Sequence, residues 1–173
     1  MKRKIIGAAI CAFLASAPFA AHAYDSTITL TGQVSANSCT VSTSAALTMP
    51  TMSTAALGTT GLTAGTTPVD ISFSGCTAGV NTVTAFFEQG GNVDATTGNL
   101  LNTGTATGVE IGLYNLDGST IALNAASGSQ NVTPAPVTNG SGTAHFVAKY
   151  VATSGTVTAG TLASNLYVTF IYA

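Results

Sequence analysis

The sequence predicts an all-β chain that folds as an antiparallel β-sandwich. Apolar residues recur at every second position in several short runs, and turn dipeptides that contain glycine separate these runs. After residue 23, no stretch repeats apolar residues at the three- and four-residue spacing of a helix. Short strands at roughly regular spacing, joined by glycine-rich turns, are typical of a β-sandwich.

The first 23 residues have the pattern of a secretory signal peptide. Basic residues 2–4 precede an apolar stretch, and Ala21-His22-Ala23 forms a small-residue cleavage motif. We place the cut after Ala23. A transmembrane anchor is the weaker alternative, because the apolar run is short and no stop-transfer flank follows it. We therefore expect no membrane span in the mature chain.

The remaining residues, 24–173, suit one domain with its own core. Three of the four basic residues lie in the signal peptide, so Lys149 alone stands against six carboxylates. A protein that binds nucleic acid needs clustered lysine and arginine to displace counterions from phosphates. The charge balance therefore excludes nucleic-acid partners and anionic membrane surfaces.

The alternating runs give the expected strands in chain order. Residues 26–34 and residues 166–173 form the first and the last of them. The intervening runs cover residues 69–76, 81–88, 108–116, 119–123 and 144–152. Most of these runs place apolar side chains on one face, as a strand with one buried face requires. Residues 81–88 are a short mixed run.

Turn residues mark the connections between these strands. Asp117-Gly118 predicts a two-residue hairpin turn, and Asn139-Gly140 predicts a turn before the strand at residues 144–152. The region between residues 42 and 68 is rich in threonine and alanine. Pro50 argues against a central strand there, so we expect a weak edge strand at residues 47–52 followed by irregular structure.

Two cysteines remain after export, Cys39 and Cys76. An oxidising compartment favours a disulfide between them. The chain-entropy account gives such a bridge about 4 kcal/mol of stabilisation. A metal site is the alternative, but no histidine or carboxylate flanks either cysteine in sequence.

The residues do not assemble the groups that an enzyme needs. His145 is the one histidine after residue 23, and no G-x-S-x-G motif occurs. The carboxylates are scattered rather than paired, and no glycine-rich loop leads to a phosphate-binding lysine. We therefore expect no catalytic activity, no cofactor and no metal site.

The two ends of the chain, together with the segments between them, resemble the chaperone–usher pilins, especially the major subunit of type 1 fimbriae. The alternating "ITLTGQV" precedes the first cysteine in "SANSCTV", and "VDISFSGC" carries the second. "LTMPTM", "VEIGLYNLDGSTIAL" and "FVAKYVAT" follow the family order. The chain ends in an alternating strand with a penultimate Tyr172, and Gly160 lies fourteenth from the end.

The resemblance implies the pilin fold, an incomplete immunoglobulin-like antiparallel β-sandwich that lacks its final strand. A donated strand completes it: a periplasmic chaperone lends one, and in the fibre the N-terminal extension of a neighbouring subunit replaces the chaperone. Donor-strand complementation of pilins is an established case of β-strand addition.

The resemblance also implies roles for particular residues. The expected domains are a signal peptide (1–23), a donor-strand extension (24–34) and the pilin domain (35–173). The donor residues are Ile28, Leu30, Gly32 and Val34. The groove and chaperone-recognition residues are Gly160, Leu166, Val168, Phe170 and Tyr172. The alternative for residues 27–34 is that they form the first strand of their own domain.

The expected function is that of a structural subunit of an extracellular fimbria on a Gram-negative cell, exported through the periplasm and supporting adhesion. Its expected partners are identical subunits, a periplasmic chaperone and an outer-membrane usher. The single-domain length favours a rod-building subunit over a two-domain tip adhesin. The alternatives are a minor linking pilin, or a monomeric secreted β-sandwich that acts as a binding module.

Overall fold

The computed structural model describes residues 38–43 and 46–173. By its internal contacts the chain divides into two units, Met1–Val34 and Ser35–Ala173, and the fold below is that of the second. The signal-peptide motif and the predicted donor residues Ile28, Leu30, Gly32 and Val34 lie outside the described residues.

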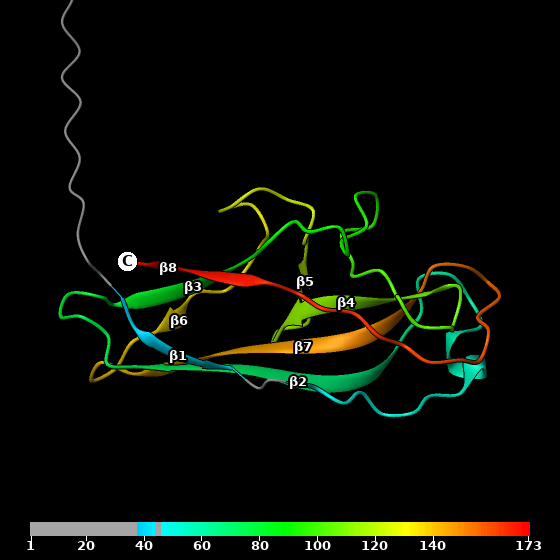
Figure 1. The fold of residues 1–173 in the computed structure, drawn as a ribbon, viewed down its shortest axis with the longest axis horizontal. Coiled ribbons are helices and arrows are strands. Elements are labelled where there is room, and N and C mark those ends of the chain that lie inside the picture. Colours follow the sequence, from blue (N-terminus) through cyan, green and yellow to red (C-terminus); the bar gives the residue numbers. More distant parts are fainter. Residues whose placement is uncertain (1–37, 44–45) are drawn as a thin grey trace, which may run out of the picture. The chain divides into compact units, whose positions relative to one another are not determined.

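The described residues form two antiparallel sheets, which face each other as layers (Figure 1). In spatial order the five-stranded sheet contains β1 (Thr40–Thr43), β2 (Thr63–Ser74), β7 (Gly142–Ala152), β4 (Val109–Asn115) and β5 (Thr120–Ile121). The three-stranded sheet contains β6 (Ala135–Pro136), β3 (Thr82–Phe87) and β8 (Val168–Tyr172). One turn of 3₁₀ helix, η1 (Thr54–Leu57), precedes β2. The predicted all-β antiparallel sandwich is confirmed.

The core lies between the sheets and is made by the alternating apolar rows of the strands. On β3 the inward residues Val83, Ala85 and Phe87 are at most 3% exposed. The rings of Phe87 and Phe146 meet edge to face across the layers, with their centroids 5.3 Å apart, a favourable arrangement for aromatic pairs. The mixed run at residues 81–88 thus becomes a strand whose burial alternates strictly along β3.

Strand β2 is longer than the sequence predicts, because it begins at Thr63 rather than at residue 69. Pro68 lies opposite Val147 of β7, whereas β1 reaches along β2 only as far as Ile71. At Pro68, β2 has no second strand partner among the described residues. Prolines within strands are found at such edge positions, where one side of the strand has no partner.

The predicted edge strand at residues 47–52 is wrong. The edge strand is β1, at Thr40–Thr43, and it pairs with Ile71–Ser74 of β2. Residues 46–52 are extended chain outside the strands of the described part. Pro50 interrupts this segment, and no neighbouring described strand pairs with it.

The two predicted turns occur, one of them in a different form. Asn139 and Gly140 form a two-residue turn with φ of 50° and 73°, closed by hydrogen bonds in both directions between Thr138 and Ser141. Between β4 and β5, the turn closed by Asn115 and Ser119 contains three residues, not two. Asn115 N donates to Ser119 O (2.9 Å), and Gly118 takes the left-handed φ of 84° that such a loop requires.

The disulfide joins the start of the domain to the end of its second strand. Cys39 precedes β1 and Cys76 follows β2, with an S–S distance of 2.11 Å and a sequence separation of 37. Because β1 and β2 pair at Thr40 and Ser74, the bridge closes the end of this strand pair. The structure thus contains the disulfide that the sequence predicts.

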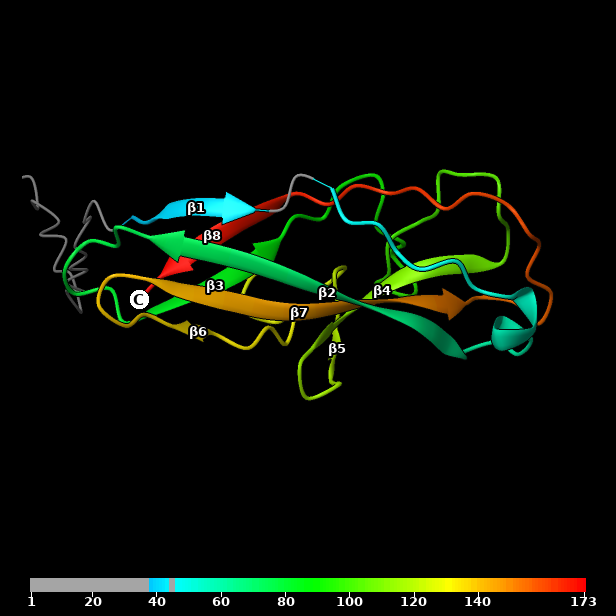
Figure 2. The same cartoon turned by 90° about the horizontal axis from the view of Figure 1, so that it is seen from below.

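The last strand, β8, pairs with β3 from Val168 to Tyr172. Ala173 extends the pairing through three main-chain hydrogen bonds: its oxygen accepts from Asn81 N (2.6 Å) and Thr82 N (2.8 Å), and its nitrogen donates to Thr82 O (3.0 Å). Figure 2 shows the C-terminal residue at the end of the β3–β8 pair. These bonds extend the pairing with β3 as far as the last residue, on one side of β8.

Candidate functional site

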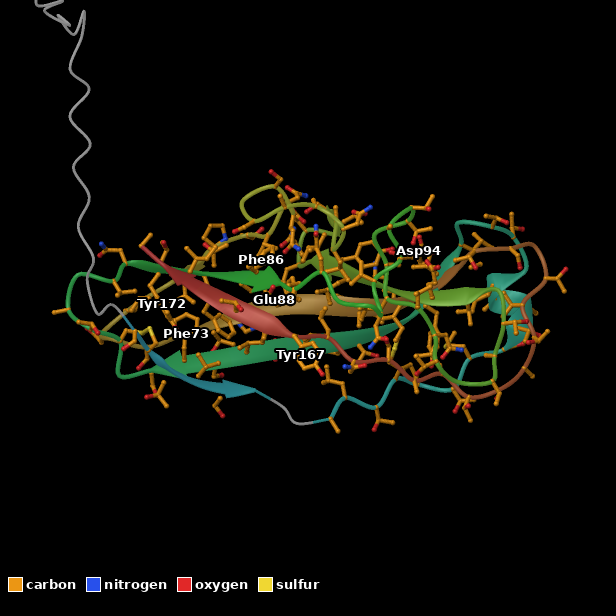
Figure 3. All side chains as sticks on the ribbon, turned by 45° about the horizontal axis from the view of Figure 1, so that its top comes forward. Phe73, Phe86, Glu88, Asp94, Tyr167 and Tyr172 are labelled. Atoms are coloured by element: carbon orange, nitrogen blue, oxygen red, sulfur yellow. A yellow bond between two sulfur atoms is a disulfide. The ribbon has the colours of Figure 1, made fainter. Side chains whose placement is uncertain are left out.

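The inward side chains of the C-terminal strand are only half-buried. Leu166, Val168, Phe170 and Tyr172 pack against the core, yet none is fully covered. Their counterparts on the adjacent β3 are almost completely buried. Figure 3 shows the sandwich with all its described side chains and marks Tyr167 and Tyr172 on the β8 segment. Partial exposure of an inward row indicates that this sheet lacks a neighbouring strand on that side.

A groove opens beside this row. Its first part is a cavity of about 520 Å³ between residues 46–49 on one side and residues 164–168 on the other. The floor of this cavity is the main core, formed by Ile71, Phe87, Leu100, Ile111, Leu113 and Ala148. Core side chains are therefore exposed to solvent between these two segments.

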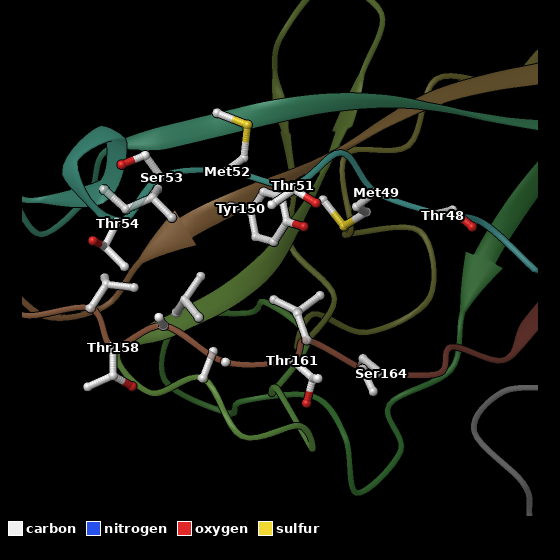
Figure 4. Close-up of a pocket in the computed structure, with 18 of the residues that line it drawn as sticks. Thr48, Met49, Thr51, Met52, Ser53, Thr54, Tyr150, Thr158, Thr161 and Ser164 are labelled. Atoms are coloured by element: carbon white, nitrogen blue, oxygen red, sulfur yellow. The ribbon is translucent and has the colours of Figure 1, made fainter.

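The groove continues into a second cavity of about 740 Å³ (Figure 4). Leu47, Met49 and Ser164 line both cavities, so the two are neighbouring parts of one groove. A smaller cluster of Leu57, Val109 and Ala152 lies at this end of the domain, and Leu57 and Val109 line the cavity. We name residues 46–52 the N-terminal wall and residues 157–168 the C-terminal wall of the groove.

Both walls carry main-chain groups without strand partners. In the N-terminal wall, Pro50 O is the one main-chain group with a hydrogen-bond partner among the described residues. The C-terminal wall continues into β8, which is an edge strand of the three-stranded sheet and pairs only with β3 within the described chain. Exposed strand edges are templates for pairing with a further strand. The groove thus offers an apolar floor between two open backbone edges.

Side-chain hydrogen bonds reinforce the main-chain bonds that attach the C-terminal wall to the body. Asn102 makes four hydrogen bonds: its amide donates to Ala106 O (2.7 Å) and Thr161 O (3.2 Å), and its Oδ1 accepts from Gly104 N (2.8 Å) and Ala163 N (2.9 Å). Thr105 and Thr161 each accept the other's backbone N–H through their hydroxyl oxygens. These bonds hold the wall at a fixed spacing from residues 102–107.

Gly160 lies at a close approach between the C-terminal wall and residues 105–106. A Cβ at Gly160 would come within 2.5 Å of Ala106 N and 2.7 Å of the Thr105 carbonyl carbon. These contacts are backbone atoms that cannot rotate away. Close approach of two backbones therefore requires glycine at this position, which gives Gly160 a structural role in the wall.

We expect Gly160→Ala to destabilise the domain by about 1–3 kcal/mol, the usual cost of inserting a methyl group into a well-packed site. Gly155→Ala is the matched control, because a Cβ at Gly155 meets nothing within 4 Å and its φ is not positive. Urea unfolding of both variants provides the comparison. Equal unfolding midpoints for Gly160→Ala and wild type would show that the wall yields without cost.

The groove is nearly free of charge. Asp70 is the one charged side chain among the described residues that line the two cavities. Its Oδ1 lies 2.7 Å from Nδ1 of His145, and both side chains are about half exposed on β2 and β7. An exposed pair of this kind contributes little to stability. An occupant of the groove therefore meets apolar and neutral polar atoms.

The two carboxyl groups whose pKa values are shifted, those of Asp94 and Asp117, lie in turns. Backbone N–H groups of Thr96 and Thr97 donate to Asp94 and lower the pKa of its carboxyl. Hydrogen bonds from the hydroxyl and backbone N–H of Ser119 lower the pKa of Asp117 in the same way. Neither residue lines the groove, and both shifts follow from local turn geometry.

Glu110 is buried, with its carboxylate accepting from Thr97 Oγ1 (2.8 Å) and Asn99 Nδ2 (3.1 Å). Nowhere in residues 38–43 and 46–173 do three metal-binding side chains converge on one point. The part of the chain that is described contains no helix of the length and apolarity that a bilayer crossing demands.

Of the predicted groove residues, Leu166, Val168, Phe170 and Tyr172 all pack against the main core. Only Leu166 and Val168 line the groove, in its smaller cavity, whereas Phe170 and Tyr172 line neither cavity. Gly160 lines the larger cavity. Sequence reasoning missed the N-terminal wall, Asn102 and Tyr150. Tyr150 shares the alternating inward row of β7 with Phe146 and Ala148, which is the one signal that could have identified it. Nothing in the sequence marks Asn102.

Comparison with known proteins gives concordant matches. The family model described as fimbrial protein matches residues 28–173. The chain is 38% identical over 172 residues to the major fimbrial subunit SMF-1 of Stenotrophomonas maltophilia, covering 92% of this chain and 99% of that protein. It is 37% identical over 160 residues to the F17 fimbrial protein of Escherichia coli, covering 87% and 88% of the two chains.

Solved structures agree on the fold. A subunit in a structure of a chaperone–usher pilus superposes with a TM-score of 0.62 at 20% identity, covering 91% of this chain and 100% of that chain. The open sandwich and the match over nearly the whole chain lead to the same assignment. The chain belongs to the fimbrial protein family, and it is a structural subunit of a pilus rather than an enzyme.

Proposed function

We propose that this subunit polymerises by donor-strand exchange, with residues 24–34 of one copy filling the groove of the next. The observation that supports this most directly is the half-exposed inward row of β8 beside an open backbone edge. Covering apolar surface is worth about 25 cal/mol per Å². An open groove over the core is therefore a site with a strong tendency to be filled.

The groove favours an extended peptide over a compact ligand. Its occupant lies between two walls with unpaired main-chain groups, which a β-strand satisfies along its whole length. To cover the apolar floor, the strand needs apolar side chains at every second position. Ile28, Leu30 and Val34 supply such a row, with Gly32 on the same face and threonines on the other.

The donor runs antiparallel to β8 in this proposal. All strand pairs of the described domain are antiparallel, and antiparallel pairing places the ladder hydrogen bonds perpendicular to the strands. In this direction Ile28 lies toward the Tyr172 end of the groove. Val34 then lies toward the end that Gly160 borders.

The open groove also explains why the subunit needs a chaperone during export. The open groove exposes core side chains and unpaired strand edges, which are aggregation hazards. A periplasmic chaperone that lends a strand protects both until an outer-membrane usher passes the subunit to the fibre. The mature subunit then begins after Ala23, is part of an extracellular fimbria and supports cell adhesion.

Deleting residues 24–33 tests the proposal. We expect fibres to disappear from the cell surface while the subunit still accumulates with its chaperone, because the deletion removes the donor and leaves the groove intact. Negative-stain microscopy and a non-boiled denaturing gel measure the two properties. The control carries Thr29→Ser and Thr31→Ser, which alter the opposite face of the same segment. Fibres assembled from the deletion variant would refute donor-strand exchange through this segment.

A further inference from the structure

We propose that Tyr150 is a positioning residue that holds the N-terminal wall in place for the incoming strand. This inference rests on the proposed function, because it concerns the same groove. The Tyr150 hydroxyl donates to Pro50 O at 3.0 Å. It is thus the hydrogen bond that ties residues 46–52 to the body of the domain within the described chain.

The fold makes room for this side chain at one defined place. Strand β2 shifts register between Ala64 and Thr67, and Gly65 within this bulge has a φ of 68°. A Cβ at Gly65 would lie 2.6 Å from Cδ2 of Tyr150. The bulge therefore seats the ring of Tyr150 directly against the β2 backbone. Bulges that re-aim a side chain beside a binding site are a recurrent feature of sheets.

The seated ring stands at the junction of the two cavities. Tyr150 pairs with Ile111 of β4, and it lines the larger cavity, whereas Ala148 and Ile111 line the smaller one. Figure 4 shows the ring between the segment that carries Met49 and Met52 and the segment that carries Thr161. From this position the hydroxyl reaches the middle of the N-terminal wall.

The hydrogen bond has a consequence for binding. A wall that is already held beside the groove needs little further ordering when a strand pairs with it, and pre-organisation of this kind increases affinity. Without the hydroxyl, residues 46–52 keep their apolar contacts and lose their tether. A donor strand must then order the wall as it binds.

The experiment uses the mature chain and a labelled synthetic peptide of residues 24–36 as the probe. Tyr150→Phe removes the hydroxyl and keeps the ring. Tyr114→Phe is the control, because Tyr114 lies under the Lys149 ammonium, 4.7 Å from its ring centroid, and lines neither cavity. Fluorescence anisotropy gives the Kd of the peptide for each variant, and thermal unfolding without peptide gives their stabilities.

We expect Tyr150→Phe to bind the peptide about fivefold more weakly than wild type, the effect of losing one net hydrogen bond. Tyr114→Phe should bind as wild type does. A Kd for Tyr150→Phe within twofold of wild type, with or without a lower melting temperature, would reduce Tyr150 to a purely structural role. Tighter binding would also overturn the inference, because the tether would then close the groove. Failure of wild type to bind the peptide would instead refute the proposed function.

Discussion

Replacing both disulfide cysteines with alanine should lower the free energy of unfolding by about 4 kcal/mol, the value that the chain-entropy account gives for a loop of this length. Cys39 and Cys76 close a loop with a sequence separation of 37 that contains β1, the N-terminal wall, η1 and β2. Without the bridge, the four-residue β1 holds the start of the domain through its pairing with β2. A domain whose total stability is about 5–15 kcal/mol loses a large share of it.

Urea unfolding of Cys39→Ala/Cys76→Ala measures this loss. Wild-type protein unfolded in the presence of a thiol reductant is the matched control, because it lacks the same bond without any substitution. Both should give the same lowered midpoint. A double variant as stable as oxidised wild type would show that the β1–β2 pairing suffices to hold the N-terminal wall.

The sequence predicts the sandwich well where strands alternate strictly. Phe146 and Ala148 on β7, and Ile111 and Leu113 on β4, lie in the core as their period-2 pattern indicates. The Asn139-Gly140 turn also follows from local chemistry, since both residues adopt positive φ. In these elements the local preference and the tertiary packing agree.

The prediction fails where tertiary context overrides local preference. The first part of β2 contains Gly65 and Pro68, both unfavourable in a strand, yet β7 pairs with it. The reason is visible only in three dimensions: at Pro68 only β7 flanks β2 in the described chain, and Gly65 lies in the bulge that seats Tyr150. The loop at Asp117-Gly118 gains Leu116 because Asn115 pairs with Ser119.

The groove was only half predictable from the sequence. The alternation of Leu166, Val168, Phe170 and Tyr172 indicates β8 and the end of the C-terminal wall that leads into it, because a strand pattern marks an inward face. The opposite wall has no regular pattern, and the side chains that hold the walls come from distant positions such as Asn102 and Tyr150. Spacing in sequence does not reveal such long-range hydrogen bonds.

The central claim is that the sandwich is incomplete until a further strand fills the groove. Appending a second copy of residues 24–36 after Ala173 through a short flexible linker supplies that strand. The linker allows the appended strand to turn back and run antiparallel beside β8, as in a hairpin. Buried Ile, Leu and Val side chains are worth about 1.5–3 kcal/mol each before ordering costs, so the three apolar donor side chains give a gain of several kcal/mol.

Thermal unfolding of this fusion is the most direct measurement. A gain of several kcal/mol raises the melting temperature by roughly 10 °C or more for a domain of this size. The control fusion carries serine in place of Ile28, Leu30 and Val34 in the appended copy, and it should melt close to the unfused protein. If the intact fusion and the serine control melt at the same temperature as the unfused chain, the domain has no open groove to fill.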